Sequence, residues 1–294
     1  MTPPGRPVDP DLTVVIPTLG RDLLRRVLEA LEAGTVWPAR VIVVDQGQRP
    51  DLGLLLEDVG ARSYDTLWVP SGERGRARGV NRGFAHAATR FVALTDDDCV
   101  PYPDWVERMA DRLRRNEGAI VTGRVEAGEG EVVLSVVTER GETVQRRPGL
   151  RFDRLSGGNM GIAKALMERL GGLDEDPCLR TAEDGELGYR ALRAGVPILY
   201  APEVAVTHLG WRREAEREEQ YRDYARSQGG FFGKYLRRGD AFIALRAAVH
   251  LLRALRRWGV GRLRGDAELA ANGRAYVLGL LPGIAAGWRS EGPG

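Results

Sequence analysis

The chain has 294 residues, of which 43% are hydrophobic and 29% charged, with a formal net charge of +2. This length accommodates one large α/β domain or two smaller ones, and the composition excludes an intrinsically disordered or an integral membrane class. The basic residues are almost all arginine, so only arginine clusters with few acids nearby count as basic patches.

No targeting, disulfide or membrane-spanning signal is found in the sequence. Cys99 and Cys178 are too few for a disulfide framework and do not have metal-binding spacing. Residues 1–11 are rich in proline and lack the apolar core of a signal peptide. The longest uncharged apolar run, 275–288, is shorter than the ~20 residues that span a bilayer as a helix. We therefore expect a protein of the reducing cytoplasm.

The first half of the chain alternates between apolar strands and amphipathic helices. Residues 12–16 form a β-branched run that stops at Pro17, and residues 41–44 form a second run that ends in Asp45. Between them, leucine and valine recur at helical spacing over 23–31. Strand, helix and strand within about forty residues predict a βαβ unit, and hence a parallel sheet covered by helices.

The same alternation continues with a strand at 66–69, a helix at 75–88 and a strand at 91–94 that leads into an acidic triplet, 96–98. Polar residues thus follow the first, second and fourth strands. Because the carboxyl ends of parallel strands meet at one edge of a sheet, we expect these residues to share one crevice. Shorter patterns predict further strands at 132–137, 196–200 and 204–206, and helices at 163–170 and 183–193.

The sequence becomes charged and helical after about residue 212. Within 234–264, Lys234 and eight arginines accompany a single acid, Asp240. On a helical wheel one side holds Arg246, His250, Arg253 and Arg257, and much of the remainder holds Leu245, Val249, Leu251, Leu252 and Leu255. This pattern predicts either an amphipathic anchor at the inner face of the cytoplasmic membrane or a helix that packs on the preceding domain with its arginines in solvent. The apolar run 275–288 is a second candidate for interfacial contact.

The triplet Asp96, Asp97 and Asp98 is the strongest local signal for chemistry. Adjacent carboxylates at the end of a buried strand repel one another, and that repulsion is costly unless a cation or hydrogen-bond donors compensate it. Carboxylate oxygens suit Mg²⁺ or Mn²⁺, which bind one or two such groups together with substrate phosphates. The alternative is a solvated acidic turn.

Several motifs, in order, resemble the family 2 glycosyltransferases, which have the GT-A fold. Residues 15–21, 43–47 and 95–105 are similar to the opening strand and turn, the second strand, and the Asp-x-Asp segment with its flank. Residues 157–161, 171–175 and 183–190 resemble the acceptor-side half of the family. The match covers about residues 11–210, and its specificity comes from the ordered co-occurrence of the motifs.

The resemblance implies an α/β, GT-A catalytic domain with a mostly parallel sheet over 11–212, after a flexible N-terminus at 1–10 and before a helical, basic extension at 213–294. It implies inverting, metal-dependent transfer of a sugar from a UDP- or dTDP-linked donor to a hydroxyl acceptor, for example a glycan or lipid-linked glycan of the cell envelope. No Gln-x-x-Arg-Trp element of processive relatives appears near Trp211. Transfer of a single sugar is therefore expected.

The resemblance also implies donor-side roles. Pro17 and Asp45 would line the base pocket, Asp96 would contact the ribose or the metal, and Asp98 would ligate the metal that bridges the diphosphate. Further donor-side residues that it implies are Thr18, Arg78, Asn81, Asp97, Gly158, Asn159 and Glu183. In the family's Ala-Arg-Asn-x-Gly element this chain has Val80 in place of the arginine, so the diphosphate contact falls to Arg74, Arg76 or Arg78.

On the acceptor side, Asp184 matches the family's catalytic base. Deprotonation of the attacking hydroxyl during a single displacement inverts the anomeric centre. The alternative role for Glu183 and Asp184 is that of helix N-terminal acids stabilised by the macrodipole. His208 matches a position where many relatives place a histidine near the metal, and the alternative is a structural histidine.

Other nucleotide-binding classes lack their signatures. Residues 229–234 have the wrong glycine spacing for a phosphate loop, and no dinucleotide-binding glycine motif follows the first strand. A sugar-nucleotide nucleotidyltransferase remains an alternative, although residues 17–20 are a poor version of its glycine-rich loop. A catalytically silent sugar-nucleotide-binding or membrane-scaffold protein is a second alternative, against which the carboxylates Asp96, Asp98 and Asp184 argue. No nucleic-acid partner is expected.

Overall fold

The computed structural model describes residues 5–60, 64–129, 136–210 and 217–290. The chain forms two compact units. The first comprises residues 1–147, 154–173 and 187–211, and the second comprises 148–153, 174–186 and 212–294. The second unit thus joins the C-terminal segment to two short earlier segments. The predicted boundary of a catalytic domain at residue 212 stays a prediction.

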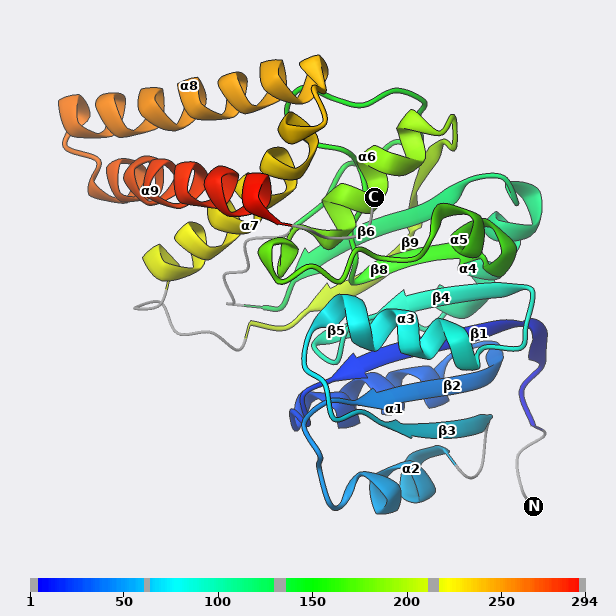
Figure 1. Cartoon of the computed structure of the whole chain (residues 1–294). Helices are drawn as coiled ribbons and strands as arrows, with labels where there is room; N and C mark the ends of the chain where they lie inside the picture. The colour runs from blue at the N-terminus through cyan, green and yellow to red at the C-terminus, as the bar shows by residue number, and fades with distance from the viewer. Residues whose placement is uncertain (1–4, 61–63, 130–135, 211–216, 291–294) are drawn as a thin grey trace. The chain divides into compact units, whose positions relative to one another are not determined.

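The first unit is built on a mixed sheet that has nine strands among the described residues (Figure 1). The strand order is β3-β2-β1-β4-β8-β6-β9-β5, and β7 pairs with β9. The strands are β1 Val8–Thr18, β2 Trp37–Asp45, β3 Asp65–Pro70, β4 Phe91–Thr95, β5 Cys99–Pro101, β6 Ile120–Ala127, β7 Thr143–Gln145, β8 Asn159–Ala163 and β9 Ile198–His208. The first half of the sheet is parallel, as predicted, whereas β8 runs antiparallel to both β4 and β6.

The helices up to Arg193 confirm most of the predicted alternation. They are α1 Leu23–Ala33, α2 Leu52–Gly60, α3 Arg76–His86, α4 Trp105–Arg115, α5 Lys164–Leu170 and α6 Glu183–Arg193, with a short 3₁₀ turn η1 at Pro177–Leu179. β9 joins the two strands predicted at 196–200 and 204–206 into one. Val8 already belongs to β1, although a flexible tail was expected there. Of the strand expected at 132–137, residues 132–135 lie outside the described residues, and Val137 forms a bridge with Val125.

Parallel pairing brings the ends of the early strands to one edge of the sheet. Thr18 at the end of β1 stands opposite Asp45 at the end of β2, and Asp45 stands opposite Pro70 at the end of β3. β4 runs parallel to β1, and every residue of β4 is buried. The acidic triplet that follows β4 therefore starts at the same edge as Thr18 and Asp45, as the sequence predicts.

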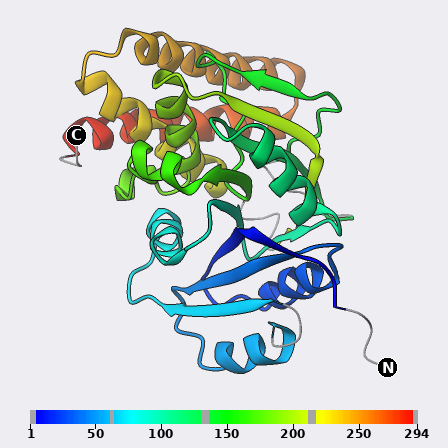
Figure 2. The ribbon, with the colours of Figure 1, turned by 90° about the vertical axis from the view of Figure 1, so that its right-hand side faces the viewer.

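The second unit contains the long helices α7 Arg217–Arg237, α8 Ala241–Arg264 and α9 Ala267–Arg289 (Figure 2). α9 packs closely against α7 and α8 because glycines line its inner side. A Cβ atom added at Gly283 would lie 2.0 Å from the Arg226 carbonyl oxygen, and one at Gly273 would lie 2.3 Å from the Trp258 nitrogen. Among the described residues, none of the helices combines the length and the apolarity required to cross a bilayer.

The predicted solvent-facing basic side of α8 is wrong in part. The Arg246 guanidinium lies 2.6 Å from the Asp153 carboxylate, and both side chains are buried. The two His250 ring nitrogens each lie 2.7 Å from an oxygen, one from the Tyr276 hydroxyl and the other from the Arg151 carbonyl. Periodicity could not reveal these inward polar partners, which come from distant parts of the sequence. Leu245, Leu252 and Leu255, which the sequence offered either to a membrane surface or to packing on the preceding domain, are exposed.

The apolar run 275–288 is likewise only partly available for interfacial contact. Ala275 and Leu280 are fully buried within the second unit. Leu278, Leu281 and Trp288 are each about half exposed. One side of this segment is therefore part of the core, which the uniform hydrophobicity of the sequence concealed.

Candidate functional site

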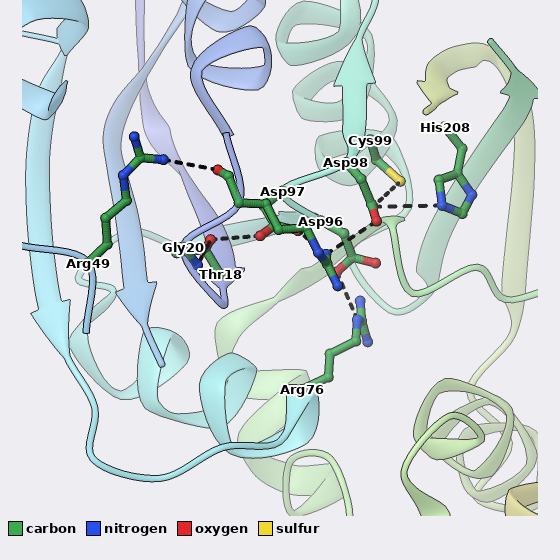
Figure 3. Close-up of polar contacts among 10 residues, drawn as sticks. Thr18, Gly20, Arg49, Arg76, Asp96, Asp97, Asp98, Cys99 and His208 are labelled. Atoms are coloured by element: carbon green, nitrogen blue, oxygen red, sulfur yellow. Dashed lines mark hydrogen bonds and ion pairs between the residues drawn. The ribbon is translucent and has the colours of Figure 1, made fainter. Parts of the chain in front are cut away.

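The link between the ends of β1 and β4 is a hydrogen bond from Thr18 to Asp97 (Figure 3). The Thr18 hydroxyl donates to Asp97 Oδ2 at 2.7 Å and accepts from the Gly20 N–H at 2.9 Å. Arg21 Nη1 lies 2.5 Å from Asp97 Oδ1. Burial raises the pKa of Asp97, while the Arg21 charge and the Thr18 hydrogen bond oppose that rise. Asp97 is thus a buried carboxylate that fixes the turn after β1, rather than a solvated acid.

Asp98, Cys99 and His208 form a cluster of metal-ligating atoms that lie within 4.8 Å of one another. Antiparallel pairing of β5 with β9 sets Cys99 opposite His208, and the Leu209 N–H donates to the Asp98 carbonyl at 2.8 Å. His208 Nε2 lies 3.7 Å from Asp98 Oδ1, and the Cys99 thiol donates to that same oxygen at 3.6 Å (Figure 3). The structure therefore brings together Asp98 and His208, two of the three residues predicted to hold a metal.

The donor set of this cluster fits a divalent transition-metal ion. It offers a carboxylate oxygen, an imidazole nitrogen and a sulfur, at separations compatible with ligands about 2.0–2.3 Å from one ion. Magnesium and manganese prefer oxygen ligands such as Asp98, whereas an imidazole such as His208 suits later transition metals such as zinc and iron. Burial, together with Asp96 and Asp98, raises the pKa of the Cys99 thiol well above its usual range.

Asp96, the third predicted metal residue, forms an ion pair with Arg76. Arg76 Nε lies 2.8 Å from Asp96 Oδ1. Arg76, one of the three arginines that the sequence left open for the diphosphate, thus lies beside the triplet. Arg78 Nη1 lies 3.6 Å from the Glu73 carboxylate. Neither arrangement was visible in the sequence, because arginine is common throughout the chain.

The glycine pair before β8 makes room for these side chains. A Cβ atom at Gly157 would lie 2.7 Å from the Arg76 guanidinium nitrogens. A Cβ atom at Gly158 would lie 2.9 Å from Cys99 Sγ and 3.1 Å from Asp96 Oδ2. Gly158, which was predicted to contact the donor, therefore lines the site. The side chain of any larger residue at this position would collide with Asp96 and Cys99.

The residues at the ends of β1 and β2 hold the adjoining turn. Both Asp45 oxygens accept backbone N–H groups, from Gly47 and Arg49, each at 3.0 Å. Pro17 packs against Gly79 of α3, where a side chain would not fit: a Cβ atom added at Gly79 would lie only 3.0 Å from the Pro17 Cβ. Asp45 is almost fully buried, so its described contacts are those of a turn-capping carboxylate. Its contact with a nucleotide base stays a prediction.

Two predicted donor-side asparagines have structural roles. The Asn81 amide donates to the Leu173 carbonyl at 2.9 Å and accepts from the Leu173 N–H at 2.8 Å. Asn159 is completely buried; its oxygen accepts from the Trp105 indole, and its nitrogen donates to backbone carbonyls of β6 and β9. These amides connect segments distant in sequence, and contact with a sugar nucleotide stays a prediction for both.

Glu183 and Asp184 begin α6 and belong to the second unit. Glu183 is buried, and Asp184 is half-buried with one carboxylate oxygen accepting the Gly185 N–H at 2.7 Å. Their position at a helix N-terminus is the one in which the macrodipole stabilises negative charge. The role of Asp184 as catalytic base stays a prediction.

Arg21 and Cys99 also belong to the candidate site, although their positions in the sequence did not indicate it. Arg21 follows the turn after β1, but an arginine gives little signal in an arginine-rich chain. Cys99 directly follows the acidic triplet, yet its proximity to His208 depends on antiparallel pairing across more than a hundred residues. The adjacency of a thiol to the triplet was the one available hint.

A sheet with these strand directions, carrying an acidic cluster where β4 ends, is the architecture of the GT-A fold. The chain belongs to the glycosyltransferase-like family 2, whose model matches residues 10–230. Among curated relatives, the pre-mycofactocin glycosyltransferase of Mycobacterium tuberculosis is 28% identical over 242 residues, which cover 79% of this chain and 48% of the relative. Chondroitin synthase of Escherichia coli is 26% identical over 228 residues, covering 63% and 32%. The chain thus spans half or less of the length of these relatives.

Solved structures show the same fold at low sequence identity. The mannosyltransferase PcManGT from Pyrobaculum calidifontis, in complex with GDP-Man and Mn²⁺, superposes with a TM-score of 0.61 at 18% identity, covering 94% of this chain and 86% of that one. Residues 1–349 of S. aureus TarS superpose with a TM-score of 0.58 at 15% identity, covering 90% and 91%. At these identities the likeness establishes the GT-A fold.

Proposed function

We propose that this chain is an inverting glycosyltransferase that transfers a single sugar from a nucleoside-diphosphate sugar to a hydroxyl acceptor with the aid of a divalent cation. The observation that carries the proposal is the cluster of Asp98, Cys99 and His208 at the end of the acidic triplet. The ends of β1, β2 and β4 supply the surrounding polar groups, and membership of the family supplies the reaction class.

Asp98 and His208 would hold the cation, with Asp96 beside them. When bound, a divalent cation neutralises the negative charge that develops on the departing nucleoside diphosphate. A nitrogen ligand from His208 disfavours Mg²⁺, because Mg²⁺ takes oxygen ligands in nearly ideal octahedral geometry; we therefore propose Mn²⁺. The Mn²⁺ named for the PcManGT complex agrees with this preference.

The donor nucleotide would lie along the ends of β1 and β2. Pro17 and Thr18 would face the base and ribose, Asp45 would accept a hydrogen bond from the base, and Arg76 would contact the diphosphate. UDP or dTDP is the donor class proposed. TarS has been solved with UDP-GlcNAc and PcManGT with GDP-Man, so the base has to be assigned by experiment.

Asp184 would remove the proton of the acceptor hydroxyl as that oxygen attacks the anomeric carbon. A single displacement of this kind inverts the configuration, whereas retention requires a second displacement or another geometry. A saccharide, a lipid-linked saccharide and a small hydroxyl compound are the acceptor classes to test. We propose a role in cell-envelope polysaccharide synthesis, with which either of the first two acceptor classes is compatible.

A nucleotide screen by thermal shift tests this function directly. UDP, dTDP and GDP are each added with and without Mn²⁺, because a ligand that binds only the folded state at a hundred times its Kd stabilises it by ~2.7 kcal/mol. We expect the largest rise in melting temperature with UDP or dTDP plus Mn²⁺, and an inverted product by NMR once an acceptor is found. Release of pyrophosphate from a nucleoside triphosphate and a sugar phosphate would instead identify a nucleotidyltransferase, and no response to any nucleotide would favour a silent scaffold.

A further inference from the structure

The outward face of α8 carries a row of exposed leucines. Leu245, Leu252 and Leu263 are 52%, 65% and 88% exposed. Leu252 follows Leu245 by about two helical turns, and Leu263 follows Leu252 by about three. All three therefore lie on one face of the helix. Ala248 and Gly259 occupy the same face and are also exposed. The face is therefore apolar over most of the length of the helix.

The inward face of α8 holds polar groups that would ordinarily point to solvent. Arg246 pairs with Asp153 inside the unit, and His250 contacts the Tyr276 hydroxyl. Ile243, Ala247 and Ala254 complete the buried side. A helix on the surface of a globular protein normally directs its apolar stripe inward, and several large apolar side chains left together on the outside mark an interaction surface.

The charged residues of α8 itself are all positive. No acid occurs between residues 241 and 264. Arg256 lies within the row, and the flanks carry Arg253, Arg262 and Arg264; all four are exposed. Over the ranges that the structure describes, none of these four forms an ion pair with an acid, and Arg253 has further arginines, Arg151 and Arg257, as its charged neighbours.

We propose that this face of α8, the leucine row with its flanking arginines, is a peripheral contact surface for an anionic membrane. The leucines would enter the boundary between headgroups and acyl chains, and the long arginine side chains would reach the lipid phosphates. A second copy of the chain is a poorer occupant, because an isologous contact would set arginines of one copy against those of the other. The proposal does not depend on sugar transfer, since an inactive chain would present the same face.

Vesicle co-sedimentation of the full chain tests this proposal. The vesicles are phosphatidylcholine alone or phosphatidylcholine with phosphatidylglycerol, at low and high salt. The test variant is L252E/L263E, and the matched control is Leu54→Glu, because Leu54 is 69% exposed on α2 of the first unit. Far-ultraviolet circular dichroism and melting temperature verify that each variant is folded, and sedimentation velocity reports the oligomeric state.

We expect the parent chain to bind the anionic vesicles, and this binding to weaken as the salt concentration rises. The partition coefficient of L252E/L263E should be at least about tenfold lower, and that of Leu54→Glu should equal the parent value. Replacement of Arg256 and Arg262 by glutamine should reduce binding to anionic vesicles and leave the weak binding to neutral vesicles unchanged. Failure of the parent chain to bind anionic vesicles at low salt would overturn the proposal, as would equal loss in the Leu54 control. A parent dimer that L252E/L263E converts to monomer without affecting vesicle binding would assign the face to a second copy instead.

Discussion

Arg21 and Asp97 form an ion pair with 2.5 Å between Nη1 and Oδ1 where β1 and β4 end. The same guanidinium nitrogen lies 3.3 Å from Asp98 Oδ2. One arginine thus compensates two neighbouring carboxylates, of which Asp97 is the more deeply buried. A divalent cation on Asp98 would lie close to this guanidinium, and the two positive charges would repel each other.

We predict that Arg21→Met lowers the stability of the fold without lowering the affinity for Mn²⁺. Stability should fall by ~1–3 kcal/mol, because Asp97 stays buried without its cationic partner; the lower end allows for the 27% exposure of the Arg21 side chain. Affinity for Mn²⁺ should not fall, since a competing positive charge has been removed. Urea denaturation and calorimetry with Mn²⁺ measure the two quantities. Arg25→Met, which removes an exposed pair with Asp58, is the control, and an equal stability loss in both variants would contradict the prediction.

Asp98→Asn should abolish Mn²⁺-dependent donor binding. An amide oxygen is neutral, so the cluster with His208 and Cys99 loses its only negative charge, while the charge of Asp96 is already compensated by Arg76. Calorimetry with UDP and Mn²⁺ is the measurement, with Asp104→Asn as a control at a nearby surface carboxylate that pairs with Arg108. Unchanged affinity in Asp98→Asn would remove this residue from the metal site.

Asp184→Asn should leave donor binding near normal and reduce transfer by ~10²–10⁴-fold, the usual contribution of a positioned base. The reason is that a base acts on the acceptor hydroxyl and not on the nucleotide. Initial rates of transfer and UDP affinity are measured on the same preparation, and a matched melting temperature verifies folding. Transfer at close to the parent rate would leave Asp184 as a helix N-terminal acid only.

The fold was predictable because its signals are local. Strong apolar runs, such as 41–44 and the β-branched segment of β1, specify buried parallel strands. Because parallel strands end at the same edge of a sheet, Thr18, Asp45 and the triplet then lie at one edge. The antiparallel direction of β8 was not predictable, because a five-residue buried strand has the same composition in either direction. Strand direction depends on the connections, and these were irregular in sequence.

The site was predictable in its carboxylates but not in the partners of those carboxylates. Three adjacent aspartates are visible in sequence, whereas the choice of Arg76 for Asp96 and Arg21 for Asp97 depends on which of many arginines the fold brings near. The same limit explains α8. A helical wheel sorts residues by face, but only the position of Asp153 decides that the face with Arg246 is the buried one.

His250 provides a test of that buried polar face through pH. Burial, reinforced by nearby arginines of which Arg246 is the first, lowers the pKa of His250 from 6.5 to about 4. The neutral ring lies against the Tyr276 hydroxyl and the Arg151 carbonyl, and it packs edge-on to Phe232. The His250 imidazole therefore takes up a proton less readily in the folded chain than in the unfolded chain.

The sign of the effect follows from this difference. Above about pH 6.5 the ring is neutral in both states, so it adds no pH dependence. As the pH falls from 6.5 toward 4, the unfolded chain takes up a proton that the folded chain does not, and the free energy of unfolding decreases by on the order of 2–3 kcal/mol before the effect levels off below pH 4. We expect His250→Gln, which cannot titrate, to lose less stability than the parent over this interval. Urea denaturation at intervals of half a pH unit measures both curves, with His86→Gln on the surface of α3 as the control. Parallel curves for the parent and His250→Gln would show that the imidazole titrates alike in both states, and that the polar face of α8 is not buried as described.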